Sequence, residues 1–262
     1  MEQARDFVEE CETLYQLLTG LADTEWDRPT LFKGWTLNDI LVHLHFWNGM
    51  AHQSLVAPDA FAQRLAAIQA KFKRDGMRAT ENADLTLRGE ALRDAWQTLY
   101  QEMGQHWANV DPKQRLKWAG PDMSARSSIT ARLMETWAHG QAAFDLLGVT
   151  RTEGDRIRNV VVLGVNTFGW TYKVNNLDVP ATVPRLTLEA PSGATWTFGD
   201  SDATDSIEGA AVEFAQVVAQ TRNIADTSLR VTGPVATQWM SIAQCFAGSA
   251  QAPPAAGARH VQ

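Results

Sequence analysis

Two side chains with the spacing of metal ligands lie in one short segment of the chain. Glu135 and His139 are four residues apart in METWAH, so on a helix they project from the same face about one turn apart. His43 lies in the apolar segment LVHL, where its ring would face a neighbouring helix. If the two helices pack together, these residues form a set of two imidazoles and one carboxylate. That set suits a catalytic divalent ion such as zinc and leaves an open position.

Both features also have structural explanations. A glutamate and a histidine at this spacing are common on solvated helix surfaces, and a buried histidine is more often a hydrogen-bonded core residue than a ligand. Asp39, one turn before His43, would either orient that ring or cap the helix. The remaining histidines are expected to be structural or exposed: His45, His52, His106 near a helix end, and His260 in the tail.

The first 148 residues have the apolar spacing of helices. Four main helices are expected: one ending at Gly20, one from Thr36 past Trp47, one over 85–107, and one from Ser124 or Ser127 to Leu147. A further helix is expected over 61–78. Thr36 with Asp39 has the pattern of a capping box, and Gly148 stands where helices end. These residues predict a four-helix bundle.

After Gly148 the pattern changes to that of a small α+β domain over 149–248. The alternating segments 185–190 and 195–198 flank a Pro-Ser-Gly turn and predict a β-hairpin. Helices are expected over 153–168, 208–222 and 234–246, and a short strand over 228–232. The Ala, Pro and Gly content of 249–262 predicts a flexible tail. The fold class is therefore α+β.

The amino-acid composition limits the partners, the metal ligands and the location that we expect for the protein. The chain has 23 basic and 30 acidic residues, a net charge of −7, so we expect neither nucleic acid nor an anionic membrane as a partner. Cys11 and Cys245 cannot form a disulfide scaffold, and a metal would have to be held by histidine and carboxylate. The acidic N-terminus does not resemble a secretory signal and no apolar segment is long enough to span a bilayer. These features predict a cytoplasmic protein.

Two segments resemble a known superfamily. Residues 34–44, GWTLNDILVHL, resemble the GWT-x-x-D-hydrophobic-x-x-HL helix of the DinB-like and mycothiol-dependent maleylpyruvate isomerase superfamily. Residues 130–141, TARLMETWAHGQ, resemble its metal-binding fourth helix, especially in the branch described as metal-binding proteins. Members of that branch also carry a C-terminal domain related to the sterol-carrier fold. The resemblance therefore covers nearly the whole chain, with a DinB-like bundle followed by a sterol-carrier-like domain.

The resemblance implies a divalent metal, usually zinc, on His43, Glu135 and His139. It also implies a low-molecular-weight thiol, mycothiol or glutathione, that is activated at the ion and attacks a small electrophile for transfer or isomerisation. An arginine of the C-terminal domain would assist substrate binding, and Arg222 is the candidate. Many relatives carry an acidic residue just after the helix-four histidine, where this chain has Ala142 and offers Asp145 instead.

Several functions stay open at this point. The first is a metal-dependent thiol transferase or isomerase, and the second is a metal-dependent hydrolase that activates water. The third is a non-catalytic protein that binds a metal or a small ligand. Seven of the ten tryptophans precede Gly148, where they would build an aromatic pocket or simply pack the core. The expected partner is a small molecule, and the chain would act as a monomer or homodimer.

Overall fold

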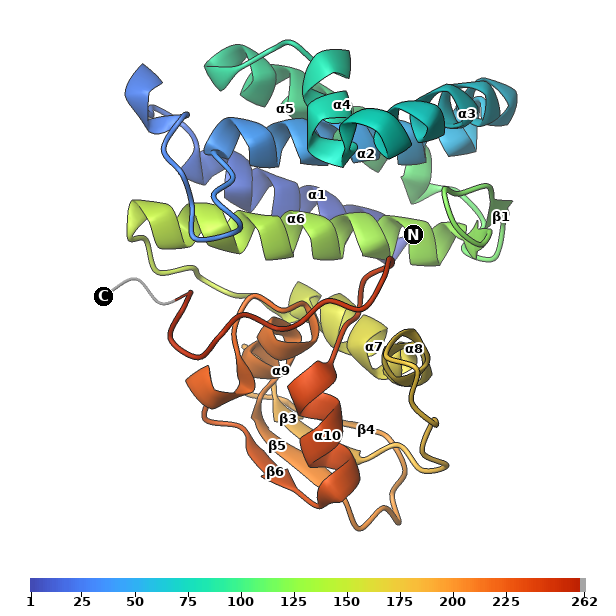
Figure 1. The fold of residues 1–262 in the computed structure, drawn as a ribbon, viewed down its shortest axis with the longest axis vertical. Helices are drawn as coiled ribbons and strands as arrows, with labels where there is room; N and C mark the ends of the chain where they lie inside the picture. The colour runs from blue at the N-terminus through green and yellow to red at the C-terminus, as the bar shows by residue number, and fades with distance from the viewer. Residues whose placement is uncertain (260–262) are drawn as a thin grey trace. The chain divides into compact units, whose positions relative to one another are not determined.

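The computed structural model describes residues 1–259 of the chain. These residues belong to two compact units, Met1–Leu146 and Leu147–Gln262. The division lies just before Gly148, the predicted domain boundary. Figure 1 shows that the first unit is built of helices and that the second combines helices with a small sheet. The fold is thus α+β, as predicted.

A helical bundle makes up the N-terminal unit. Its helices are α1 (Glu2–Leu17), α2 (Leu37–Val56), α3 (Pro58–Asp75), α4 (Met77–Asp84), α5 (Gly89–Ala108) and α6 (Ala125–Leu147). Helices α1 and α2 pack against α5, and Cys11 of α1 contacts Thr136 of α6. A two-stranded sheet, β1 (Arg115–Leu116) and β2 (Met123–Ser124), precedes α6. Helices α1, α2, α5 and α6 correspond to the four helices of the predicted bundle.

The helices that carry the candidate ligands begin where predicted: α2 continues past Trp47, as expected, and α6 ends at the predicted Leu147. Thr36 accepts a hydrogen bond from the Asp39 backbone, and the Asp39 side chain accepts one from the Thr36 backbone, which completes the capping box of α2. Ser124 accepts from the Ser127 backbone at the start of α6. Gly148 has φ +66° directly after the end of α6. These local contacts set the register of His43, Glu135 and His139.

The expected single helix over 61–78 is wrong. The chain forms two helices there, α3 and α4, because Gly76 between them adopts φ +83°, a conformation that interrupts a helix and is open mainly to glycine. Helix α4 then packs against α2 as well as α3. Helix α5 starts at Gly89 rather than at residue 85. The turn at Gly76 therefore brings α4 over the helix that carries His43.

The C-terminal unit contains a four-stranded mixed sheet in the order β4-β3-β5-β6. The predicted hairpin is confirmed: β3 (Arg185–Glu189) and β4 (Thr195–Phe198) are antiparallel, with Leu188 paired to Trp196. Strand β5 is parallel to β3 and antiparallel to β6. The other elements of this unit are α7 (Arg158–Asn166), α8 (Phe168–Val174), β5 (Ser206–Ala210), α9 (Ala211–Val218), β6 (Arg230–Thr232), α10 (Pro234–Ile242) and the short 3-10 turns Asp155–Ile157 and Ile224–Asp226. A further 3-10 turn, Asp23–Glu25, belongs to the N-terminal unit.

Two predicted helices in this unit differ from the structure. The helix expected over 208–222 is wrong at both ends, because residues 208–210 belong to β5 and α9 stops at Val218. Strand pairing with β3, with Gly209 opposite Leu188, takes precedence over the local helical spacing. The helix expected over 153–168 is divided into a 3-10 turn and α7, and α8 begins at Phe168.

The tail differs from the expected loose attachment. The amide of Gln220 donates to the Gln251 carbonyl at 2.9 Å, and the amide of Asn223 donates to the Pro254 carbonyl at 2.7 Å. Such bonds give buried or half-buried amide groups their partners, which holds this part of the tail on the C-terminal unit. Residues 260–262, and with them His260, lie outside the described residues.

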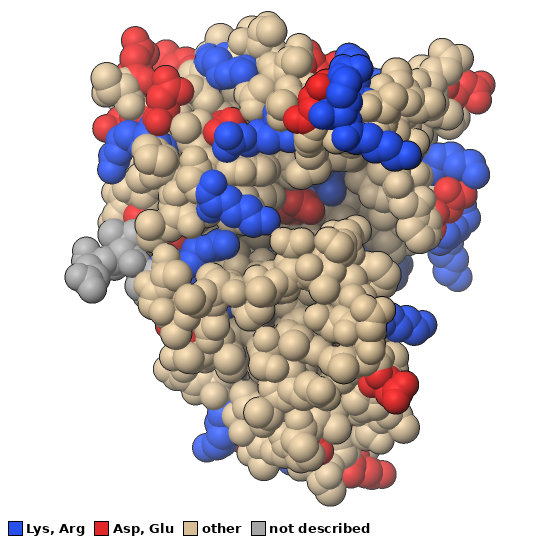
Figure 2. Space-filling model, viewed as in Figure 1, with Lys and Arg blue, Asp and Glu red and all other residues tan. Residues whose placement is uncertain are grey.

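The surface of the helical unit carries charges of both signs. On the face drawn in Figure 2, Lys and Arg lie beside Asp and Glu over the helices, while the drawn face of the C-terminal unit is mostly uncharged. Between residues 1 and 259, we find no helix with both the length and the apolar character needed to cross a membrane.

Candidate metal centre

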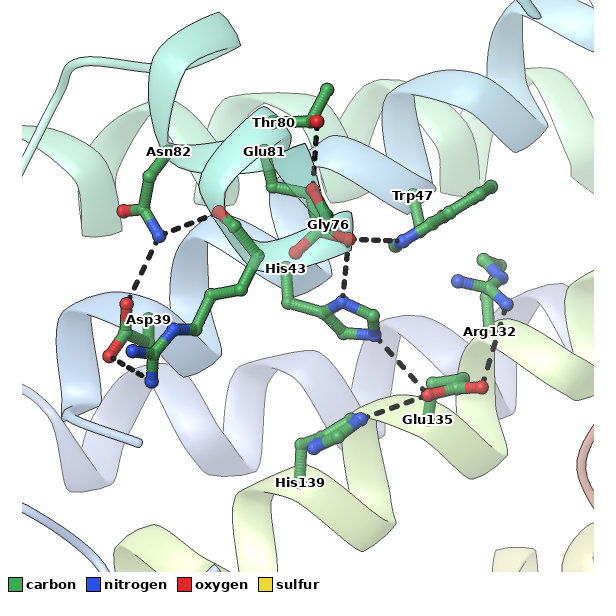
Figure 3. Close-up of polar contacts among 11 residues, drawn as sticks. Asp39, His43, Trp47, Gly76, Thr80, Glu81, Asn82, Arg132, Glu135 and His139 are labelled. Carbon is green, nitrogen blue, oxygen red and sulfur yellow. Dashed lines mark hydrogen bonds and ion pairs between the residues drawn. The ribbon is translucent and has the colours of Figure 1, made fainter. Parts of the chain in front are cut away.

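The structure brings His43, Glu135 and His139 together inside the helical unit. His43 comes from α2, and Glu135 and His139 come from successive turns of α6. Oε2 of Glu135 is 3.6 Å from Nε2 of His43 and 3.0 Å from Nε2 of His139. Figure 3 shows both rings directed at this carboxylate. One ligand atom from each residue lies within 4.8 Å of the others, close enough to surround a single ion.

A fourth residue, Glu81 on α4, orients the His43 ring. Its Oε1 lies 3.1 Å from Nδ1 of His43 and accepts a hydrogen bond from Nε1 of Trp47 at 2.7 Å. Because a carboxylate only accepts hydrogen bonds, Nδ1 of His43 carries a proton and donates a hydrogen bond to Glu81. The neutral ring then has its lone pair on Nε2, the atom that faces Glu135. A carboxylate behind a histidine is the usual support of a metal-binding imidazole.

The charges in the centre are strongly coupled. Burial by itself would lower the pKa of His43, but hydrogen bonds to Glu135 and Glu81 outweigh burial and raise that pKa to about 9. Burial would raise the pKa of Glu135, yet hydrogen bonds from His139 and His43 hold it well below its usual value. Burial lowers the pKa of His139. In the metal-free protein at neutral pH, His43 therefore carries a second proton, on Nε2, at the place where a cation would bind.

Aromatic side chains enclose the centre. The ring of Trp35 stacks on His139, with centroids 5.6 Å apart and an interplanar angle of 1°, and Phe32 meets the same imidazole edge-on at 4.9 Å. Both residues precede α2, and Trp35 also contacts His43. Trp137 is instead a core residue, 1% exposed. Some of the tryptophans therefore line the site and others pack the core.

Arg132 is a second functional candidate that sequence reasoning missed. It lies one turn before Glu135 on α6, is 5% exposed, and places Nη2 4.0 Å from Oε1 of Glu135. Its guanidinium lies over the ring of Trp118 at 5.3 Å. The three-residue spacing to Glu135 is visible in the sequence and would have placed it on the ligand face. For Glu81 the sequence offers no comparable indication.

Other predicted residues have different contacts. Asp39 caps α2 and accepts from Asn82 of α4 at 3.1 Å, so it holds α4 rather than the His43 ring. Asp145 accepts from Gln141 at 2.9 Å. Arg222 lies beyond the end of α9, is buried, and donates from Nη1 to the Thr221 carbonyl at 2.8 Å. Its role toward a substrate stays a prediction.

A second histidine cluster lies between α2 and α5 and differs in one decisive contact. Nε2 of His52 is 3.2 Å from Nδ1 of His106 and 3.5 Å from Oε1 of Glu102. The indole of Trp107 donates to Nδ1 of His52 at 3.3 Å. Because an indole N–H only donates, the neutral His52 ring carries its proton on Nε2, the atom that faces the cluster. To bind a metal at this nitrogen, the neutral ring would have to move its proton to Nδ1 and lose the bond from Trp107, so we assign this cluster to hydrogen bonding.

Comparison with known proteins places the helical unit in a family. Residues 7–144 match the model of the mycothiol maleylpyruvate isomerase N-terminal domain, a segment that covers more than half of the chain and contains the whole candidate centre. The chain belongs to this family. In each of two strains of Mycobacterium tuberculosis, an uncharacterized protein is 37% identical over 246 residues, which covers 93% of this chain and 94% of the relative.

A solved structure of the family also matches. It is the crystal structure of the mycothiol-dependent maleylpyruvate isomerase, with a TM-score of 0.49 and 16% sequence identity, covering 82% of this chain and 87% of that one.

Proposed function

We propose that this chain is a metal-dependent enzyme that binds zinc at His43, Glu135 and His139 and activates a low-molecular-weight thiol, mycothiol or glutathione. The thiol would isomerise a small electrophile or be transferred to it. The observation that carries the proposal is the convergence of Nε2 of His43 and Nε2 of His139 on one carboxylate oxygen. The family is that of the mycothiol maleylpyruvate isomerase N-terminal domain, which supports a thiol nucleophile over an activated water molecule.

The residues present fit a zinc ion. Two imidazoles and a carboxylate are a donor set typical of catalytic zinc, and three protein ligands leave a coordination position for a thiol. The hydrogen bond from His43 to Glu81 leaves the lone pair of the ring on the atom that faces Glu135. A bound divalent ion would lower the pKa of a coordinated thiol toward neutrality and so supply a thiolate nucleophile.

The protein's own side chains prepare the site for this chemistry. Glu81 holds the proton of His43 at Nδ1, away from the ligand position. Trp35 and Phe32 pack on His139 and restrict water around its ring. Because α2 and α6 both supply ligands, an ion would also cross-link the bundle. Within this proposal Arg222 assists binding of the substrate.

Elemental analysis tests the metal. We expect about one zinc ion per chain in wild-type protein purified without added metal, and strong loss in the His43→Ala, Glu135→Ala and His139→Ala variants. His106→Ala is the matched control, because His106 is exposed and belongs to the hydrogen-bonded cluster. Equal zinc in all of these proteins would refute the proposed centre.

Spectroscopy of cobalt-substituted protein tests the thiol. Addition of mycothiol or glutathione should produce a sulfur-to-cobalt charge-transfer band, since the open position accepts a thiolate. A metal-loaded protein that shows no such band with either thiol would instead support a hydrolase that activates water, or a protein that binds its ligand without catalysis.

A further inference from the structure

A buried guanidinium beside the candidate centre has two N–H groups that no described residue pairs. Arg132 is 5% exposed, and among residues 1–259 its Nε and Nη1 have no hydrogen-bond partner. Its closest acidic contact is the 4.0 Å approach of Nη2 to Glu135, which is longer than a hydrogen bond. A buried guanidinium stays protonated, and leaving its N–H groups unpaired costs free energy. A bound anion would pair these N–H groups and remove this cost.

The charges of the centre do not supply partners for these N–H groups. With neutral imidazoles, the carboxylates of Glu81 and Glu135 balance one divalent ion. A coordinated thiolate would balance the charge of Arg132 in sum, but it would bind the ion and leave Nε and Nη1 of Arg132 unpaired. These two buried N–H groups therefore favour a second anionic group beside Arg132.

Trp118 holds the guanidinium without using its N–H groups. The guanidinium carbon lies over the indole ring, 5.3 Å from its centroid, and the indole contacts Trp47 at 5.6 Å between centroids. Such a cation–π contact helps to position an arginine and uses none of its N–H groups. Trp118 is partly exposed and lies in the connection between β1 and β2, so the guanidinium contacts a residue that solvent reaches.

We propose that Arg132 is the anion-binding residue of the site and that its guanidinium receives a carboxylate of the small molecule that reacts there. The inference rests on the proposed function, because it places the carboxylate next to His43, Glu135 and His139. The carboxylate belongs either to the electrophile or to the thiol. In both cases the site selects a carboxylate-bearing molecule over its neutral analogue.

Two pairs of probes test the proposal by isothermal titration calorimetry on zinc-loaded protein. Maleate and maleamide differ in the charge of a small electrophile, and N-acetylcysteine and N-acetylcysteamine are thiols that differ in one carboxylate. In at least one pair we expect the charged probe to bind about 10- to 100-fold more tightly. The pair that shows this preference identifies the source of the carboxylate.

The preference should disappear in Arg132→Gln and Arg132→Met, and part of it should remain in Arg132→Lys. Arg126→Gln is the matched control, since Arg126 is an exposed arginine of the same helix. Arg132→Met should also keep or raise the melting temperature, because it removes an unpaired buried charge. A purely structural arginine would instead lower it.

Three results would overturn the proposal: no preference in either pair for wild-type protein, a preference that survives in Arg132→Gln, or loss of zinc from the Arg132 variants. The last result would mean that Arg132 acts only through Glu135. Failure of the proposed function is distinguishable, because wild-type protein would then hold no zinc. The preference for carboxylate, measured on the metal-free protein, would still report on Arg132.

Discussion

Replacing Glu81 by glutamine should weaken zinc binding while the fold is kept. The side-chain oxygen of glutamine can still accept the two bonds that Glu81 accepts, from His43 at 3.1 Å and from Trp47 at 2.7 Å. Only the negative charge is lost, and with it part of the basicity of the His43 ring. Loss of such a supporting carboxylate typically costs 10- to 100-fold in metal affinity, about 1.4 to 2.7 kcal/mol.

The comparison with Glu81→Ala separates charge from packing. Alanine leaves two buried N–H groups without an acceptor, at about 1–3 kcal/mol each, so this variant should lose stability as well as zinc affinity. Glutamine keeps both acceptors and loses only the charge interaction with His43, so it should lower the melting temperature of the metal-free protein by less than alanine does.

Competition with a chromophoric chelator measures the zinc dissociation constant of each protein. Glu102→Gln is the matched control, because Glu102 faces His52, whose ring does not present a free nitrogen to its cluster. If Glu81→Gln binds zinc within twofold of wild type, Glu81 does not support His43 as a metal ligand and the argument from the position of its proton fails.

Three further predictions concern the proton on His43 and the turn at Gly76. Hydrogen bonds to Glu135 and Glu81 outweigh burial and raise the pKa of His43 from 6.5 to about 9, so zinc must displace a proton from His43 at neutral pH. The apparent affinity for zinc should therefore rise about tenfold per pH unit and level off near pH 9. A zinc affinity that does not change with pH would contradict this prediction. The same raised pKa stabilises the metal-free protein fully below pH 6.5 and ceases to do so as the pH rises to about 9, so its melting temperature should fall across that window in wild type more than in His43→Ala. Gly76→Ala should destabilise the protein by roughly 1–3 kcal/mol, since φ +83° and ψ 162° suit glycine alone, and it should weaken zinc binding by displacing α4. Thermal melting and chelator competition measure both effects, with Gly120→Ala as the control because an added Cβ there meets open space. Equal effects of the two substitutions would count against the role of the turn.

Local patterns were sufficient to predict the parts of the centre that lie on single helices. The capping box at Thr36 and the four-residue spacing of Glu135 and His139 depend on neighbours in sequence, and the structure contains both. The apolar surroundings of His43 predicted that its ring would face a neighbouring helix, and the structure shows that this helix is α6. Whether the three residues bind a metal stays a prediction.

Long-range contacts account for what the sequence did not reveal. Glu81 lies on a helix with many polar residues, where a glutamate normally faces solvent, and it is buried only because the turn at Gly76 folds α4 onto α2. Likewise, residues 208–210 form a strand because β3 supplies a parallel partner. The position of Glu81 depends on one unusual backbone conformation, at Gly76, and the strand at 208–210 depends on pairing with a segment about twenty residues away. Neither can be predicted from the neighbouring residues alone.

The hydrogen bond between Trp47 and Glu81 allows the state of the centre to be followed through the indole N–H of Trp47. Trp47 and His43 share one carboxylate oxygen, so any change in charge on His43 alters the strength of the bond that the indole donates. The indole N–H groups of Trp26, Trp96 and Trp239 have no acceptor within residues 1–259. Among the indole resonances of a proton–nitrogen spectrum, that of Trp47 is therefore a native reporter that registers occupancy of the centre without a label, a substrate or a coloured metal.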